Sequence, residues 1–226
     1  MSPARRHPQP SAATGAGRRK LSRNLAANWT GDARVFVPQG YEPGYDYPLL
    51  VWLSNKDGDS FDLGRAMARV SLRNFVAVQP ARDGAAMWRA IDRVTDRLSI
   101  HPRRIWLVGH GSSGTDAFRT ACQHPDAFTG VVSLGGDFPH SEPILGRLAE
   151  VRRMPMLLCS QAAALAANPT ALDRTLRLFH SCGGTLTVRI YQQGSCLSRA
   201  TLADVNRWLM DELCGATVPL QPHGAA

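Results

Sequence analysis

Residues 105–116 of this 226-residue chain, Ile-Trp-Leu-Val-Gly-His-Gly-Ser-Ser-Gly-Thr-Asp, have the types and spacing of a turn that presents a nucleophile. In the pattern G-x-S-x-G, a buried strand ends in a sharp turn and a helix follows at once, which lifts a serine hydroxyl above the sheet for attack on an acyl group. Counted from Gly109, the serine position falls on Gly111. The sequence therefore predicts that the turn is kept and that its nucleophile is absent.

Three side chains beside this turn are candidate substitutes for the missing chemistry. Ser112 and Ser113 follow the turn, and His110 precedes it. A slip of the pattern by one residue makes Ser112 the nucleophile but puts His110 where the first glycine belongs. In the unslipped pattern Ser112 begins the helix, and its backbone N–H faces the site of the developing oxyanion. Ser112 and Ser113 remain the alternative nucleophiles.

The elements that position this turn alternate along the chain. Residues 34–38 are predicted to form a short strand. Continuous apolar runs indicate strands that are covered on both faces, at residues 48–53, 75–78, 105–108 (within a strand over 104–108), 130–134, 156–159 and 186–191. Helical patterns lie between them, at residues 60–70, 85–98, 115–124, 169–180 and 200–213. Apolar residues in 85–98 have the spacing of one buried helix face: Met87, Trp88, Ile91, Val94 and Leu98. We therefore predict an α/β fold, with a mostly parallel, doubly wound sheet and helices on both faces.

The order of these elements resembles the phospholipase/carboxylesterase-like branch of the α/β-hydrolase superfamily. Besides the turn, residues 35–53, Val-Phe-Val-Pro-Gln-Gly-Tyr-Glu-Pro-Gly-Tyr-Asp-Tyr-Pro-Leu-Leu-Val-Trp-Leu, resemble the first strands of that family. Residues 204–210, Asp-Val-Asn-Arg-Trp-Leu-Met, resemble its last helix. The resemblance covers residues 29–214. It implies a single α/β-hydrolase domain and an ancestor that hydrolysed carboxylic esters by acyl transfer through serine.

The resemblance also implies an oxyanion site after the second predicted strand. The family usually has Leu-His-Gly there, whereas residues 53–58 of this chain are Leu-Ser-Asn-Lys-Asp-Gly. Ser54 and Asn55, together with Ser112, are the candidate binding residues of a vestigial oxyanion region. Asp57 would repel a developing negative charge. A simple polar turn is the alternative interpretation of this segment.

The acid of the triad normally follows the seventh strand, but residues 151–172 contain no Asp or Glu. The uncharged polar candidates in that segment are Ser160, Gln161, Asn168 and Thr170. Some hydrolases place the acid after the sixth strand, where Asp137 stands in the sequence Gly-Gly-Asp-Phe-Pro. An aspartate in such a loop is also typical of a turn.

The histidine of the triad is expected nine residues before the aspartate of the last-helix motif, Asp204. That position is occupied by Ser195, and the only histidine after residue 181 is His223, near the end of the chain. Gly111, the segment without an acid and Ser195 are far apart in the sequence, so one misalignment does not explain all three. We predict a catalytically inactive pseudo-esterase, and keep as the alternative a weak or rewired serine carboxylesterase that uses Ser112 or Ser113.

Composition limits the partners of this protein. The formal net charge is +8, and residues 1–24 carry six basic residues and no acidic one. Such a tail is typical of disorder rather than of nucleic-acid recognition. We predict a basic disordered tail over residues 1–28, one domain over 29–214 and a flexible tail over 215–226. A small molecule or a protein at the vestigial active-site face, or a second copy of the chain, is the expected partner.

The remaining patterns point away from metals, cofactors and membranes. The five cysteines have no C-x-x-C spacing, which predicts free thiols rather than a zinc site or a disulfide framework. No apolar run approaches the roughly 18 residues of a membrane span, and the basic tail lacks the apolar stretch of a signal peptide. The sequence predicts a cytoplasmic protein without metal or cofactor.

Overall fold

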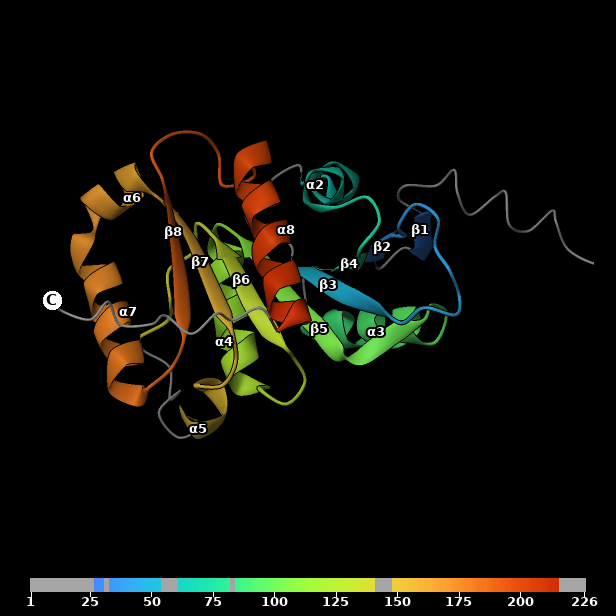
Figure 1. The fold of residues 1–226 in the computed structure, drawn as a ribbon, viewed down its shortest axis with the longest axis horizontal. Coiled ribbons are helices and arrows are strands. Elements are labelled where there is room, and N and C mark those ends of the chain that lie inside the picture. The colour runs from blue at the N-terminus through green and yellow to red at the C-terminus, as the bar shows by residue number, and fades with distance from the viewer. Residues whose placement is uncertain (1–26, 31–32, 54–60, 82–83, 141–147, 216–226) are drawn as a thin grey trace, which may run out of the picture.

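A computed structural model of the chain describes residues 27–30, 33–53, 61–81, 84–140 and 148–215. Eight strands form one sheet in the order β1-β2-β4-β3-β5-β6-β7-β8 (Figure 1). The strands are β1 (Ala27–Thr30), β2 (Ala33–Phe36), β3 (Tyr47–Leu53), β4 (Val76–Pro80), β5 (Ile100–His110), β6 (Gly130–Leu134), β7 (Met156–Gln161) and β8 (Leu186–Tyr191). The pairs β1/β2 and β2/β4 are antiparallel, and the other pairs are parallel.

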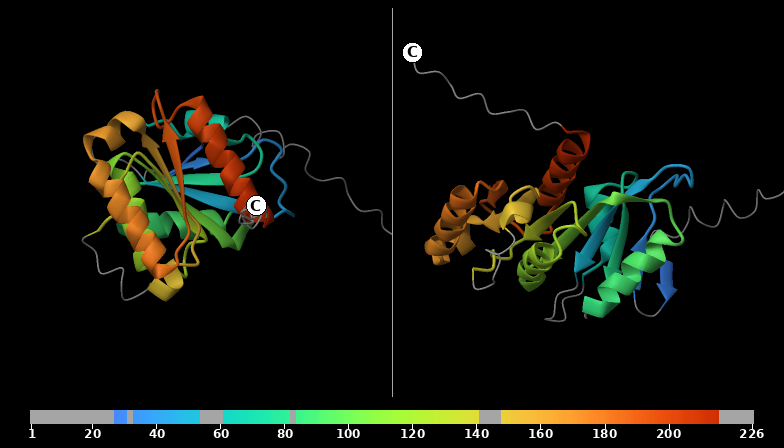
Figure 2. Two further views of the ribbon diagram at one scale, coloured as in Figure 1. Left: turned by 60° about the vertical axis from the view of Figure 1, so that its left-hand side comes forward. Right: turned by 90° about the horizontal axis from the view of Figure 1, so that it is seen from below.

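Helices cover both faces of the sheet (Figure 2). They are α2 (Leu63–Val70), α3 (Gly84–Thr95), α4 (Ser112–Gln123), α5 (Leu148–Val151), α6 (Ala162–Ala167), α7 (Pro169–Cys182) and α8 (Arg199–Cys214). Buried residues of α2 and α8 pack in one hydrophobic cluster, and those of α3, α4 and α7 pack in the other. The predicted fold class, a mostly parallel doubly wound sheet with helices on both faces, is confirmed.

Strand β3 shows why the apolar runs are continuous. Leu49 and Val51 belong to the cluster under α3 and α4, whereas Leu50 and Trp52 belong to the cluster under α2 and α8. Because successive side chains of a strand point to opposite faces, a strand covered on both faces must be apolar at every position. All four side chains are almost completely buried. On the predicted inner face of α3, Met87, Ile91 and Val94 are buried, whereas Trp88 is partly buried against the same cluster. Leu98 is buried just beyond the end of the helix.

Several elements differ from the sequence prediction. Strand β5 begins at residue 100 rather than 104, and the short helices α5 and α6 have no predicted counterpart. Helix α6, Ala-Ala-Ala-Leu-Ala-Ala, has no polar face, so its sequence lacks a helical period. Strand β1 begins at Ala27, inside the predicted tail 1–28. Its backbone pairs with β2, and its sequence has no apolar pattern that would have indicated a strand. Residues 1–26 and 216–226 lie outside the described residues.

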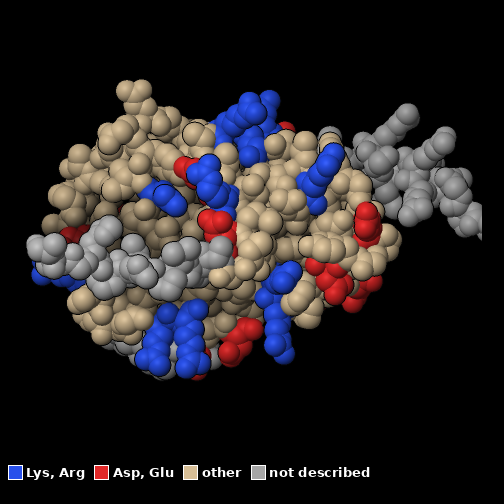
Figure 3. Space-filling model, viewed as in Figure 1, with Lys and Arg blue, Asp and Glu red and all other residues tan. Residues whose placement is uncertain are grey.

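Charged side chains are mixed on the face shown in Figure 3. Lys and Arg form separate groups there, with Asp and Glu between several of them, so this face has no continuous basic surface. Within the part of the chain that the structure describes, no helix is long and apolar enough to cross a membrane.

Candidate functional site

The turn between β5 and α4 has the backbone that the motif requires. Gly111 has φ 59° and ψ −129° and is the N-cap of α4. Residues with a side chain rarely adopt a positive φ, so glycine stabilises this conformation. The turn is held by two backbone hydrogen bonds, from Gly111 N to Leu134 O at 2.9 Å and from Gly114 N to Gly111 O at 2.9 Å. The strand–turn–helix unit predicted from the sequence is therefore present.

Three further glycines allow backbone segments to approach one another closely around this turn. A Cβ atom on Gly109 would lie 2.0 Å from Ser113 O, and one on Gly136 would lie 2.5 Å from Gly111 O. A Cβ atom on Gly114 would lie 2.4 Å from the hydroxyl of Ser133. These distances are too short for a real carbon atom. The close packing of the turn thus depends on glycines other than Gly111.

A pocket of about 270 Å³ opens beside Gly111, at the carboxyl ends of the parallel strands. Ligands bind at this end of the sheet in open α/β folds. The lining residues come from the ends of β5, β6, β7 and β8 and from the helices that follow β7. They are His110, Gly111, Leu134, Gly135, Asp137, Ser160, Gln161, Ala164, Leu165, Asn168, Ser195 and Cys196.

The positions that the resemblance assigns to a catalytic triad meet in this pocket. Gly111 occupies the nucleophile position, Ser195 the histidine position, and Ser160 and Gln161 lie at the end of β7 where an acid is expected. The side-chain amide of Gln161 donates a hydrogen bond to the carbonyl of Gly194. This bond links the end of β7 to the loop that carries Ser195, so an amide joins the same two segments that an acid and a histidine would join in a triad.

Two groups with acid–base chemistry also line the pocket. Asp137 is an exposed residue of the loop after β6, and its backbone carbonyl accepts a hydrogen bond of 2.8 Å from the Thr115 hydroxyl. His110 is partly buried at the end of β5. The structure therefore brings these two sequence-derived candidates into one pocket with Gly111 and Ser195.

The two candidate serines next to the turn lie in different surroundings, and neither is a lining residue of the pocket. Ser113 is 1% exposed; its hydroxyl accepts a hydrogen bond from His110 N at 2.9 Å and lies within donating distance of Leu53 O and His110 O. Ser112, the first residue of α4, is exposed. The candidate oxyanion residues Ser54 and Asn55 lie outside the described residues.

The bonds of Ser113 predict a structural role. Ser113→Ala removes the hydroxyl that bonds to His110 N and lies near Leu53 O and His110 O, so we expect the free energy of unfolding to fall by about 1–3 kcal/mol. Urea unfolding followed by circular dichroism measures this change. Ser112→Ala is the control, because an exposed first-turn residue should change the stability by no more than about 0.5 kcal/mol. Equal losses in both variants would contradict the structural role.

Cys196, in the loop after β8, forms part of the pocket wall next to Gly135. Its side chain is 9% exposed, and burial raises the pKa of its thiol. Burial also raises the pKa of the Cys122 and Cys159 thiols to about 12. Because the thiolate is the nucleophile, these three cysteines are poorly suited to attack a substrate at neutral pH.

The burial of the cysteines predicts the order in which they react. At pH 8 a raised pKa leaves very little thiolate, so iodoacetamide should modify the exposed Cys214 well before Cys122, Cys159 and Cys196. Peptide mass spectrometry over a time course measures the order. In a denaturant all of them should react at similar rates. Modification of Cys196 as fast as Cys214 in the folded protein would be inconsistent with the burial described.

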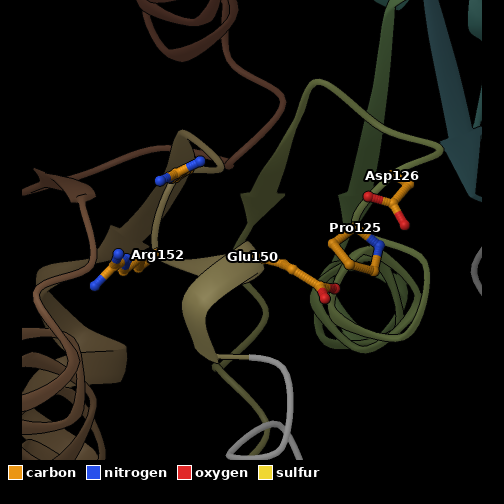
Figure 4. A pocket seen from close by; sticks show the side chains of 5 residues that line it. Pro125, Asp126, Glu150 and Arg152 are labelled. Atoms are coloured by element: carbon orange, nitrogen blue, oxygen red, sulfur yellow. The ribbon is translucent and has the colours of Figure 1, made fainter.

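A second hollow, of about 330 Å³, lies at the opposite end of the sheet. Pro125, Asp126, Glu150 and Arg152 line it with Arg153, in the segments that precede β6 and β7 (Figure 4). The Glu150 carboxylate points toward Pro125, whereas the Arg152 side chain points away from it. Strand β5, which leads into the turn at Gly111, ends at the other edge of the sheet. No group of three metal-ligating side chains is found among the described residues.

Comparisons with known proteins identify the fold. No family model matches the chain. A curated protein, "Putative esterase NocK" of Nocardia uniformis subsp. tsuyamanensis, is 35% identical over 49 residues, which span 22% of this chain and only 14% of that protein.

Solved structures match over much more of the chain. A thermostable esterase has a TM-score of 0.61 at 15% identity, over 79% of this chain and 58% of that one. The feruloyl esterase module from Clostridium thermocellum, solved with sinapinate, has a TM-score of 0.60 at 14% identity over 86% of both chains. S-formylglutathione hydrolase (FrmB) from Staphylococcus aureus has a TM-score of 0.54 at 12% identity, over 80% of this chain and 92% of that one.

The sheet order, the tight turn between β5 and α4 and these neighbours agree with the resemblance found in the sequence. The chain has the α/β-hydrolase fold, and it is similar to the esterase-like branch of proteins with that fold.

Proposed function

We propose that this protein is a pseudo-esterase, which binds a small molecule in the pocket beside Gly111 and does not hydrolyse esters. One observation carries the proposal: Gly111 and Ser195, at the expected nucleophile and histidine positions, line a single pocket with Gln161, which ends the strand after which the acid is expected. Gly111 has no side chain, Gln161 carries an amide rather than an acid, and Ser195 stands where the histidine is expected. Acyl transfer through serine requires an activated hydroxyl, a histidine that moves its proton and an acid that orients the histidine.

The pocket itself supports a binding function. Its polar side chains converge from several strand ends, and apolar side chains complete its wall. A concave site of this composition at the carboxyl edge of an α/β sheet is the usual place of a ligand. Its volume of about 270 Å³ lies just below the roughly 300–1,000 Å³ of pockets for drug-sized ligands, so the ligand is a small one.

The alternative, a rewired carboxylesterase that uses Ser112 or Ser113, has less support. The Ser113 hydroxyl is buried and hydrogen-bonded to backbone groups, so it is poorly placed to reach a substrate. The Ser112 side chain is exposed but does not line the pocket that holds His110 and Asp137.

Labelling with a fluorophosphonate probe, together with turnover of short-chain p-nitrophenyl esters, tests the proposal. We expect no labelled serine and no saturable hydrolysis above the buffer rate. Labelling of a serine, identified by peptide mass spectrometry, would overturn the proposal. Loss of that label in Ser112→Ala but not in Ser195→Ala would instead establish the rewired esterase.

A further inference from the structure

The pocket beside Gly111 is lined by a hydroxyl group that has no hydrogen-bond partner among the described residues. Ser160, the fifth of the six residues of β7, is 5% exposed and lines the pocket. Its side chain forms no hydrogen bond with any of the described residues. The Ser160 oxygen is not one of the fully buried side-chain atoms without a partner, so it is open to the pocket. A group that enters the pocket would supply the missing partner.

The charge of the pocket restricts which group this is. Asp137 is the one acidic residue among the described lining residues, and none of them is Lys or Arg. The Asp137 carboxylate forms no ion pair within the part of the chain that the structure describes. A cationic ligand would neutralise this carboxylate, whereas an anionic ligand would be repelled by it.

The amino end of α4 does not reverse this preference. A helix terminus carries about half a positive charge, which is smaller than the full negative charge of a carboxylate. The N–H of Gly111, a residue that lines the pocket, already donates to Leu134 O. A carboxylate or phosphate ligand would therefore find no Lys or Arg side chain among the described lining residues, where His110 is the one imidazole.

The rest of the wall limits the shape of the ligand. Leu134, Ala164 and Leu165 form apolar surface, and the volume of about 270 Å³ leaves room for a small molecule only. Burial of apolar ligand surface against these side chains favours a compact hydrocarbon group. Asp137 and Ser160 supply the polar contacts.

We infer that this pocket binds a small organic cation, an amine with a compact apolar group. The ammonium pairs with the Asp137 carboxylate, the Ser160 hydroxyl makes a hydrogen bond to the ligand, and the hydrocarbon lies against Leu134, Ala164 and Leu165. This inference rests on the proposed function, because it takes the pocket as a binding site. It adds the chemical class of the ligand.

Titrations of the ¹⁵N-labelled full-length protein with benzylamine, benzyl alcohol and benzoate test the inference at pH 7. The three probes share a ring and differ in charge. We expect benzylamine to shift the amide signals of His110, Gly111 and Gly135 and to bind about five-fold more tightly than benzyl alcohol, as an accessible ion pair allows. Benzoate should bind most weakly.

Variants assign this preference to its residues. Asp137→Asn should abolish the difference between benzylamine and benzyl alcohol, and Ser160→Ala should weaken the binding of both. Asp92→Asn is the matched control, because Asp92 is an exposed residue of α3 and does not line the pocket. It should leave all affinities unchanged. Signals outside the pocket that stay in place show that each variant is folded.

Three results would overturn the inference: tighter binding of benzoate than of benzylamine, an amine preference that persists in Asp137→Asn, or no shift at the pocket with any probe. The titration measures binding without turnover. A labelled serine in the fluorophosphonate experiment would therefore refute the pseudo-esterase while the amine preference could still hold, and the converse result would refute only the ligand class.

Discussion

Restoring two side chains should create a reactive serine in this protein. In Gly111→Ser/Ser195→His, a hydroxyl and an imidazole return to two positions that line the same pocket, with Asp137 nearby as an acid. General-base catalysis contributes about 10²–10⁴-fold to such reactions. We expect the double variant to react with a fluorophosphonate and to hydrolyse p-nitrophenyl acetate about 10²-fold faster than Gly111→Ser alone.

The control for this experiment is Gly111→Ala/Ser195→His, which has the same base and the same backbone strain but no hydroxyl. It should remain unlabelled. Both double variants should be less stable than the parent protein by about 1–3 kcal/mol, because a side chain at φ 59° strains the turn. If the serine double variant is folded yet no more reactive than Gly111→Ser, the two positions do not have the relation that the pocket indicates.

The second large effect is on stability and concerns Gly109. We expect Gly109→Ala to lower the free energy of unfolding by about 3 kcal/mol or more, because its Cβ would lie 2.0 Å from Ser113 O and 2.4 Å from Ser113 C. Both are backbone atoms, so the first turn of α4 must move. Overpacking of this kind costs about 1–3 kcal/mol where side chains yield, and more where they do not. Urea unfolding measures the loss.

Gly84→Ala is the matched control for Gly109→Ala. Gly84 is the exposed first residue of α3, and a Cβ there has no neighbour within 4 Å. Alanine should stabilise the protein by about 0.4–1 kcal/mol, since it restricts the unfolded chain and favours the helix. A similar effect of the two substitutions would mean that β5 and α4 are not packed as closely as described.

The fold was predictable because its signals are local and repeated. Buried parallel strands must be apolar on both faces, so the runs in β3, β5 and β6 stand out in the sequence. The turn between β5 and α4 was predictable as well, because its glycines have the spacing of the G-x-S-x-G pattern. Strand β1 and helix α6 were not predictable, since backbone pairing holds the first and the second has neither an apolar period nor a capping side chain.

The candidate site was only partly predictable. Family spacing led to Gly111, Ser195 and Asp137, and these three residues do line one pocket. The roles of Gln161 and Ser160 depend on which atoms face one another across two strands, and a sequence carries no signal for that. The absence of Asp and Glu from residues 151–172 indicated that the acid is missing. It did not indicate that the amide of Gln161 would donate a hydrogen bond to the carbonyl of Gly194.

The hydrogen bond between Gln161 and Gly194 also separates the shape of the pocket from proton binding. A histidine in such a contact changes its charge near neutral pH, so the strength of the contact depends on pH. A carboxamide and a peptide carbonyl do not titrate in that range. The attachment of this loop to β7 should therefore be the same in acidic and alkaline compartments.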